Sequence, residues 1–317
     1  MSDIIADIKS LDIKTENETY YVTDVSFDIK EGEILGIVGE SGSGKTLTIK
    51  AMLGLLPDDL FYTAERFSVF GSDFNNISVK ERKKIVGRNI GVVAQNTIFY
   101  LHPLIRIKNQ IADGYTHCFG KAKAEGIKRA RLLLCKVGFN DPERILNSYP
   151  WQLSGGMRQR VNIAMALMNE PSLIIADEPT TALDSGLQKQ VVDLFKSINT
   201  ETGASLLIVS HDMGLVKYVC DRVIVFYAGQ ILEEGLRDEV FNFPLHPYTK
   251  ALISVIPSMN VRKGERLSEI KGVFPNLHKK TDGCIFYDRC PVRMEICRKS
   301  VAVYSEGGHR CRCNLYA

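Results

Sequence analysis

The stretch GESGSGKT, residues 39–46, follows the apolar run EILGIVG at residues 33–39 and precedes the helical stretch TLTIKAMLGLL. It fits the pattern G-x-x-x-x-G-K-[ST], whose glycines let the backbone curl so that successive N–H groups point at phosphate oxygens. Lys45 can reach the β- and γ-phosphates, and the Thr46 hydroxyl can bind Mg²⁺. This strand, loop and helix predict a nucleotide-phosphate site. Its expected binding residues are Gly39, Ser41, Gly42, Ser43, Gly44, Lys45, Thr46 and Thr48.

Strand and helix patterns alternate along the chain around this loop. The first thirty residues alternate apolar and polar positions, as half-buried strands do. Continuous apolar runs, typical of buried strands, occur in IGVVAQ, SLIIADE, SLLIVSH and RVIVFYAGQIL, which begin at residues 90, 172, 205 and 222. Residues from about 100 to 165 are mostly helical in pattern. Strands that alternate with helices predict an α/β fold with a parallel, doubly wound sheet.

The composition is that of an ordinary soluble globular protein. The 317 residues are 45% hydrophobic and 24% charged, and the net charge of +3 is too small to indicate a nucleic-acid partner. No apolar run approaches the ~18 residues that a membrane span needs. The start, MSDIIADIKS, has no signal-peptide pattern. We therefore expect a cytosolic chain, in which clustered cysteines favour metal binding or redox chemistry over disulfides.

Two carboxylates end the apolar run SLIIADEP at residues 172–179. A buried strand rarely ends in this way without a cation or a water molecule to hold. We expect Asp177 to lie in the Mg²⁺ shell and Glu178 to orient or deprotonate an attacking water.

A second candidate anion site lies in LSGGMRQR, residues 153–160, directly before a helix with an apolar face. The hydroxyl of Ser154 and the amides of Gly155 and Gly156 can bind an anion at a helix N-terminus. A simple helix cap explains the same residues. Because the chain already has a phosphate loop, a second anion site needs a reason.

Taken together, these motifs resemble the nucleotide-binding subunit of ATP-binding-cassette (ABC) transporters over about residues 5–255, in the family's order and spacing. The resemblance implies a P-loop ABC ATPase core at residues 1–255, with a parallel sheet, an antiparallel β subdomain and an inserted helical subdomain at about 98–165. Residues 256–317 would form a small cysteine-rich extension. It also implies ATP and Mg²⁺ as ligands and ATP hydrolysis as the activity.

The resemblance also assigns roles to single residues. LIVSHD places His211 at the family's switch histidine, and VVAQ places Gln95 at its Q-loop glutamine, near Mg²⁺. Together with Glu178 and Lys45, these would be the catalytic residues. Ser154, Gly155 and Gly156 would contact ATP bound to a partner subunit, with Asp184 at the same interface. Each site would then be completed across a dimer, which explains two anion-binding elements in one chain.

An aromatic residue normally stacks on adenine in this family, and here its identity stays open. Thr15 stands near the aligned position. Tyr20 or Tyr21 could stack instead, and we choose Tyr21, although cross-strand packing explains either tyrosine equally well. The stretch NTIFYLHP after Gln95 also departs from the usual polar version.

The end of the chain resembles the ATPases of oligopeptide and dipeptide importers, in LHPYTKALISVIP (residues 245–257), RCP and the terminal CNLY. The resemblance implies uptake of peptides, or of nickel complexes or oligosaccharides. The partners would be two membrane permease subunits, a second identical or related ATPase and an extracytoplasmic binding protein, with this chain at the cytoplasmic membrane face. A non-transport ABC ATPase and a redox protein are the alternatives; the compact helical interval disfavours the first.

Five of the eight cysteines lie in the last 34 residues of the chain. The tail's resemblance to peptide-importer ATPases points to one [4Fe–4S] cluster, which spacing alone cannot establish. Its expected ligands are Cys284, Cys290, Cys297 and Cys313, a usual set of four thiolates. Its expected role is to staple a tail too short for a core of its own.

Structural zinc is the main rival, although the spacing C-x₅-C-x₆-C is looser than the close pairs typical of zinc sites. A disulfide-bonded tail is a third reading. Cys311 could replace Cys313, and His309 is an alternative ligand. The scattered Cys118, Cys135 and Cys220 read as small core residues.

Overall fold

The computed structural model describes residues 3–94, 100–181, 183, 185–256, 270–275 and 280–316. Two predicted site residues, Gln95 and Asp184, lie outside these ranges. The chain divides into two compact units. The signature unit is built mainly from residues 30–33 and 77–209, and the phosphate-loop unit from residues 4–29, 34–76 and 210–317.

The phosphate-loop unit begins with an antiparallel sheet, as expected. Strand β1 alternates buried and more exposed residues, because one face of the sheet covers the core. The strands run β2, β1, β5, β6, and β4 also pairs with β1. Their bounds are β1 Ile4–Lys14, β2 Tyr20–Lys30, β4 Phe61–Thr63, β5 Arg66–Val69 and β6 Ser72–Asp73.

A second sheet in this unit joins the phosphate-loop strand to the end of the chain. Strand β3 (Ile34–Val38) is buried throughout and pairs in parallel with β10 (Arg222–Tyr227). Strand β11 (Gln230–Leu236) pairs with β10 and also with β13 (His309–Arg312), both antiparallel, and β12 (Val303–Glu306) completes the edge. The cysteine-rich tail therefore continues the core sheet.

The helices of the phosphate-loop unit are short. α1 (Lys45–Leu53) begins at the phosphate loop, and α9 (Met213–Val219) lies against β3. The others are α10 Arg237–Asn242, α11 Pro247–Ser254 and the 3₁₀ turns η2 Tyr287–Arg289, η3 Glu295–Arg298 and η4 Asn314–Tyr316.

The signature unit has a parallel three-stranded sheet. Strand β8 (Leu173–Asp177) pairs with β7 (Ile90–Val93) and with β9 (Ser205–Ser210). Four of the five residues of β8 and all of β9 are buried, which explains their continuous apolar sequence.

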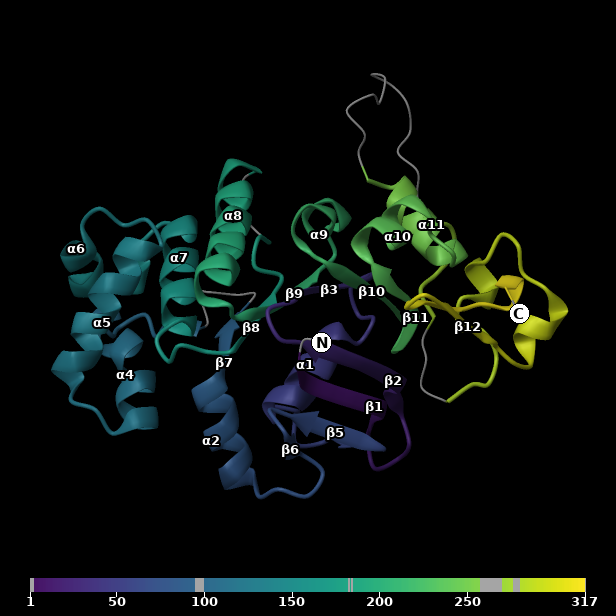
Figure 1. Cartoon of the computed structure of the whole chain (residues 1–317), viewed down its shortest axis with the longest axis horizontal. Coiled ribbons are helices and arrows are strands. Elements are labelled where there is room, and N and C mark those ends of the chain that lie inside the picture. Colours follow the sequence, from purple (N-terminus) through teal and green to yellow (C-terminus); the bar gives the residue numbers. More distant parts are fainter. Residues whose placement is uncertain are drawn as a thin grey trace. The chain divides into compact units, whose positions relative to one another are not determined.

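The expected helical subdomain is present in the signature unit. Helices α4, α5 and α6 pack on one another, and α4 and α5 also pack on α7, as Figure 1 shows. The unit's helices are α2 Val79–Asn89, α4 Ile107–Phe119, α5 Lys123–Lys136, α6 Pro142–Asn147, η1 Pro150–Gln152, α7 Gly155–Ala166 and α8 Ser185–Thr202.

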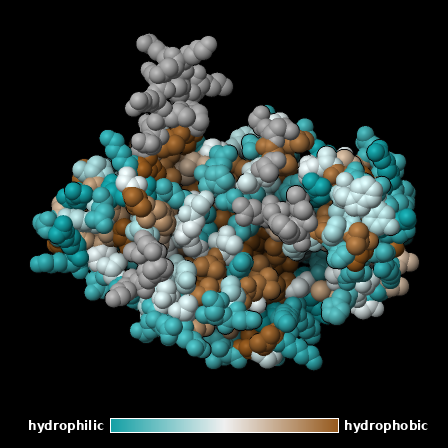
Figure 2. Space-filling model, turned by 180° about the vertical axis from the view of Figure 1, so that it is seen from behind, coloured by the Kyte–Doolittle hydropathy of each residue, from teal (hydrophilic) through white to brown (hydrophobic). Residues whose placement is uncertain are grey.

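Hydrophobic and hydrophilic residues are mixed on the surface. Figure 2 shows hydrophobic residues interspersed with hydrophilic ones over the face seen there. Within the ranges given above, no helix is long and apolar enough to cross a membrane.

Candidate nucleotide site and cysteine cavity

Glycine is required at two points of the phosphate loop. Gly39 has φ +154°, and a Cβ there would lie 2.1 Å from the carbonyl oxygen of Phe226. Gly44, at the start of α1, has φ +102°, and a Cβ would lie 3.2 Å from the carbonyl oxygen of Tyr21. Both positions combine an unusual backbone with close packing, so only glycine lets the loop curl here.

Lys45 folds over the loop that it follows. Its buried Nζ donates to the carbonyl oxygens of Gly39 (2.8 Å) and Glu40 (2.9 Å) and to Oγ of Ser43 (3.1 Å). The first turn of α1 has no acidic residue, and Thr46 is exposed there, so the helix N-terminus favours an anion. The Thr48 hydroxyl instead donates to the Gly44 carbonyl oxygen at 3.1 Å within the helix.

The two candidate tyrosines have different surroundings. The Tyr20 hydroxyl accepts a hydrogen bond from Nζ of Lys14 at 3.2 Å, and the same ammonium lies 5.1 Å from its ring centroid. The Tyr21 side chain is 41% exposed, and its backbone lies against the last glycine of the phosphate loop. Tyr21 is therefore the more exposed of the two tyrosines, and its backbone adjoins the phosphate loop.

In the signature unit, β8 ends at the two predicted carboxylates. Glu178 has φ +47°, a conformation that is uncommon for any residue except glycine and that often marks a functional site. Its N–H donates to the carbonyl oxygen of Val209 at 2.8 Å, which fixes this backbone to β9. Its Oε2 accepts from the Thr181 hydroxyl at 3.0 Å. The carboxylate of Glu178 is thus held directly after Asp177.

Ser154 does cap a helix, as one of the two interpretations of LSGG predicted. Its Oγ accepts a hydrogen bond from the N–H of Met157 at 3.3 Å, at the start of α7. Gly155 is exposed, and its added Cβ would meet nothing within 4 Å. A Cβ on buried Gly156 would lie 3.0 Å from Leu187. The cap leaves the helix start open to solvent, where a further anion can approach.

In the phosphate-loop unit, His211 follows β9 directly and is exposed. The next residue, Asp212, caps α9 by accepting from the N–H groups of Gly214 and Leu215. The histidine therefore projects from a strand end that a helix cap holds in place.

The four predicted cluster ligands line one cavity in the tail. Cys284, Cys290, Cys297 and Cys313 surround it together with His246 of the segment before α11. The five cysteines of the tail form no disulfide in the described part of the chain. Among the residues that the structure covers, no group of three or more His, Cys, Asp or Glu side chains is arranged to hold a metal ion.

The thiols of the cavity are not equivalent. Burial raises the pKa of Cys284 to about 11. A hydrogen bond from Cys311 lowers the pKa of Cys313 to about 6, whereas the same bond raises the pKa of Cys311. The thiolate is the metal-binding form, so the lowered pKa of Cys313 agrees in direction with its prediction as a ligand.

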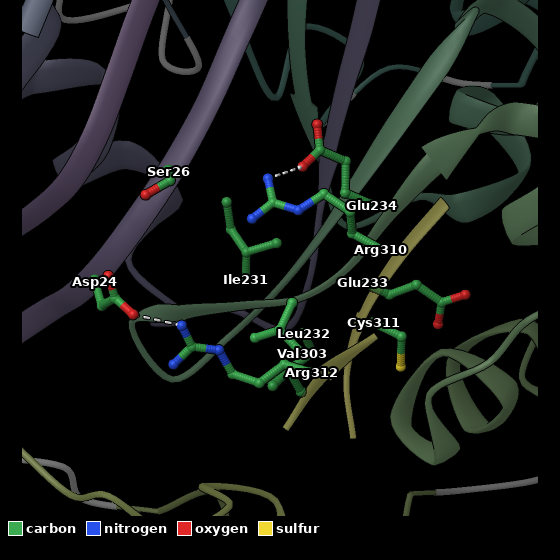
Figure 3. A pocket seen from close by; sticks show the side chains of 10 residues that line it. All are labelled: Asp24, Ser26, Ile231, Leu232, Glu233, Glu234, Val303, Arg310, Cys311 and Arg312. Carbon is green, nitrogen blue, oxygen red and sulfur yellow. Dashed lines mark hydrogen bonds and ion pairs between the residues drawn. The ribbon is translucent and has the colours of Figure 1, made fainter. Parts of the chain in front are cut away.

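Cys311 lines another pocket, which Figure 3 shows. On β13, Arg310 and Arg312 extend to one side toward Glu234 and Asp24, and Cys311 points away from them. The alternation follows from the two-residue period of a strand. His309 does not line the cavity of four cysteines, and its Nε2 lies 2.8 Å from the carboxylate of buried Glu233.

Sequence reasoning missed His246. It is 1% exposed, and burial lowers its pKa to about 4, so the ring is neutral. Nδ1 accepts from the N–H of Tyr248 at 3.0 Å, which leaves the proton on Nε2. Nε2 is buried and has no hydrogen-bond partner among the residues that the structure describes. The signal in the sequence was its place in LHPY, but only packing brings it to the cysteines.

Comparisons with known proteins identify two matching regions, one over the nucleotide motifs and one over the C-terminal part of the chain. The chain matches the ABC transporter family over residues 22–181 and the C-terminal region of oligopeptide/dipeptide transporters over residues 232–297. It is 39% identical to a probable peptide ABC transporter ATP-binding protein of Sinorhizobium fredii, over 98% of this chain and 95% of that protein. It is 41% identical to the dipeptide transport ATP-binding protein DppD of Bacillus subtilis, over 87% and 82%.

Solved structures agree with these relatives. The dimeric structure of MJ0796, a bacterial ABC transporter cassette, is similar with a TM-score of 0.64 and 31% identity, over 73% of this chain and 98% of that one. A post-hydrolysis dimer of the same cassette, bound to ADP and phosphate, has a TM-score of 0.63 at the same identity and coverage.

Proposed function

This chain belongs to the ABC transporter family, as an ATP-hydrolysing subunit of its oligopeptide and dipeptide branch, and we propose that it drives peptide uptake through membrane permeases. The observation that carries this proposal is the match of residues 232–297 to the peptide-transporter C-terminal region, beside an ABC core. The named relatives favour peptides over nickel complexes or oligosaccharides. The chain would act peripherally at the cytoplasmic membrane face, with two permease subunits, a second ATPase subunit and an extracytoplasmic binding protein.

The domain boundaries belong to the same proposal. Residues 1–255 would be the ATPase domain, with its helical subdomain at about 98–165, and residues 256–317 the C-terminal extension. The extension is not a separate folding unit, because its strand β13 pairs with β11 of the ATPase domain.

In the proposed nucleotide site, the phosphate loop and Lys45 bind the phosphates, and Tyr21 stacks on adenine. Thr46, Asp177 and Gln95 would hold Mg²⁺, which supplies charge neutralisation for the phosphates when it is bound. The fit rests on the open N-terminus of α1, where Thr46 is exposed and no acidic side chain occupies the first turn.

Glu178 is proposed as the residue that orients and deprotonates the attacking water, with His211 as the switch residue. The support for Glu178 is its fixed position: a left-handed backbone tied to β9, and a carboxylate oriented by Thr181. A general base must be held within hydrogen-bond reach of the proton that it removes.

The signature residues would act on the ATP of a second subunit. Ser154, Gly155 and Gly156 present an open helix start, and Asp184 is assigned to the same interface. The similar cassette MJ0796 is a dimer, which agrees with this role.

An exposed apolar group on the signature unit is proposed as the permease contact. Leu104 is 75% exposed, Ile105 39% and Trp151 64%. Their segments adjoin, because the N–H of Ile107 donates to the carbonyl oxygen of Ser148 at 3.0 Å. Apolar side chains gathered on a surface favour a protein partner.

The cavity of four cysteines is proposed to hold one [4Fe–4S] cluster, with Cys284, Cys290, Cys297 and Cys313 as ligands. The four thiols share one cavity, and their spacing C-x₅-C-x₆-C is looser than the close pairs typical of zinc sites. The partnerless Nε2–H of His246 at the same cavity is a donor for a sulfur atom. When bound, the cluster would cross-link the tail.

Two preparations test these proposals. Purification of the chain from its native membrane should yield two permeases and a peptide-binding protein; recovery with sugar- or nickel-importer components would reassign the cargo. Anaerobic purification should give a brown protein with about four irons per chain. Stoichiometric zinc without iron would show a zinc site and contradict the cluster. A tail without any metal would contradict both the cluster and the zinc site.

A further inference from the structure

Glu40, the second residue of the phosphate loop, is held by side chains from later parts of the phosphate-loop unit. Its N–H donates to the hydroxyl of Tyr248 in α11 at 3.1 Å. Its carboxylate accepts two hydrogen bonds from Arg289, at 2.6 and 3.1 Å. Its carbonyl oxygen accepts from Lys45, the phosphate-binding lysine. One residue thus links the loop to the tail.

Arg289 is fixed in place by all five of its N–H groups. Besides the two bonds to Glu40, it donates to the hydroxyl of Tyr227 (3.2 Å) and to the carbonyl oxygens of Ile270 and Lys271 (3.1 Å each). Its side chain is 4% exposed. A planar guanidinium with every donor satisfied has one orientation, so it holds the carboxylate in one orientation too.

The same tail segment is anchored by an apolar contact. Phe286 is 1% exposed, and its ring centroid lies 5.3 Å from those of both Tyr227 and Tyr248. Tyr248 is the residue whose hydroxyl holds the N–H of Glu40. Phe286 therefore packs on one residue that holds Glu40, and Arg289 holds Glu40 directly. Both Phe286 and Arg289 lie between Cys284 and Cys290 in the sequence.

We propose that Arg289 is a positioning residue for ATP binding, which acts through Glu40 and makes the cysteine-bearing tail part of the nucleotide-binding machinery. Without Arg289, the Glu40 carboxylate would stand in a loop that must receive phosphate oxygens, and it would repel them. The loop would also lose its outer anchor, so that binding would have to order it. The inference extends ATP binding by this family and does not depend on the metal in the tail.

The direct test is the Kd of the full-length chain for MgATP, measured by calorimetry, with kcat from a steady-state ATPase assay. Arg289→Ala should raise Kd about 5- to 30-fold, the range that loss of one or two kilocalories gives. It should change kcat less than about twofold, because the residue touches no reacting group. Arg289→Lys keeps the charge but loses the two parallel hydrogen bonds of the guanidinium, so its Kd should lie between those of wild type and Arg289→Ala.

Two further variants separate positioning from general damage to the tail. Arg298→Ala removes an exposed arginine of the same tail, which stacks on Tyr287 and not on the loop, and it should leave Kd unchanged. In a Glu40→Gln background, Arg289→Ala should have at most a small additional effect, because the ion pair is already lost.

Three results would overturn the proposal. The first is a Kd of Arg289→Ala within twofold of wild type. The second is an equally large rise of Kd when Arg289→Ala is added to Glu40→Gln. Arg298→Ala and Arg289→Ala could weaken ATP binding in proportion to a shared loss of thermal stability. A wild-type chain that binds MgATP without hydrolysing it would count against the assigned activity, and the Kd comparison would still decide the role of Arg289.

Discussion

Glu233 joins three segments of the phosphate-loop unit, and its removal should be severely destabilising. The side chain is 0% exposed. Its carboxylate accepts from the N–H groups of Leu245 and His246, each at 2.8 Å, and lies 2.8 Å from Nε2 of His309. Glu233→Ala removes the partner of these three groups, of which the Leu245 N–H is partly buried and the other two are buried, and a buried group left unpaired costs about 1–3 kcal/mol. Three such losses sum to about 3–9 kcal/mol, and because water can enter the vacated space we expect the lower part of that range, about 3–5 kcal/mol.

Thermal unfolding followed by circular dichroism measures this loss. At about 2–4 °C per kcal/mol for a protein of this size, Tm should fall by roughly 6–20 °C. Glu233→Gln keeps one acceptor oxygen but turns a donor toward the N–H groups, so its Tm should lie between. The control is Glu306→Ala, since Glu306 is exposed on β12 and its loss should cost no more than about 0.5 kcal/mol. If Glu233→Ala matches that control, the three contacts do not hold the tail to the core.

Three further predictions concern the nucleotide site and the cysteine cavity. Glu178→Gln should bind ATP, accumulate as an ATP-bound dimer and lose about 10²- to 10⁴-fold in turnover; near wild-type turnover in a steady-state assay would remove its assigned role. Ser154→Arg should retain ATP binding by the single subunit and lose hydrolysis, because a bulky cation blocks dimer closure; a collapse of monomer affinity would contradict the composite site. Cys313→Ala should lose iron after anaerobic purification while Cys311→Ala retains it, and the reverse pattern of iron content would exchange the two assignments.

The local geometry of the phosphate loop and of the helix starts could be predicted because short motifs determine it. The glycines of the loop and the lysine six residues after its start can be recognised directly in the sequence. The structure places the Lys45 ammonium within hydrogen-bond distance of the loop carbonyl oxygens. The cap at Ser154 was readable for the same reason, since a cap bonds to the third residue after it. The cavity lined by Cys284, Cys290, Cys297 and Cys313 agrees with the predicted grouping. The spacing of the cysteines in the sequence could not show that they line one cavity.

The sequence by itself determined the family and the order of strands and helices, because periodicity and motif spacing act over a few residues. Only the tertiary structure decided what the tail does to the core. The cysteines stand far along the chain from the phosphate loop, which suggested a separate staple, yet Arg289 contacts Glu40 across 249 positions. Such a contact depends on how β13 continues the sheet and how Phe286 packs between two tyrosines. No local pattern encodes a pairing between distant segments, since it is selected by the packing of the whole unit.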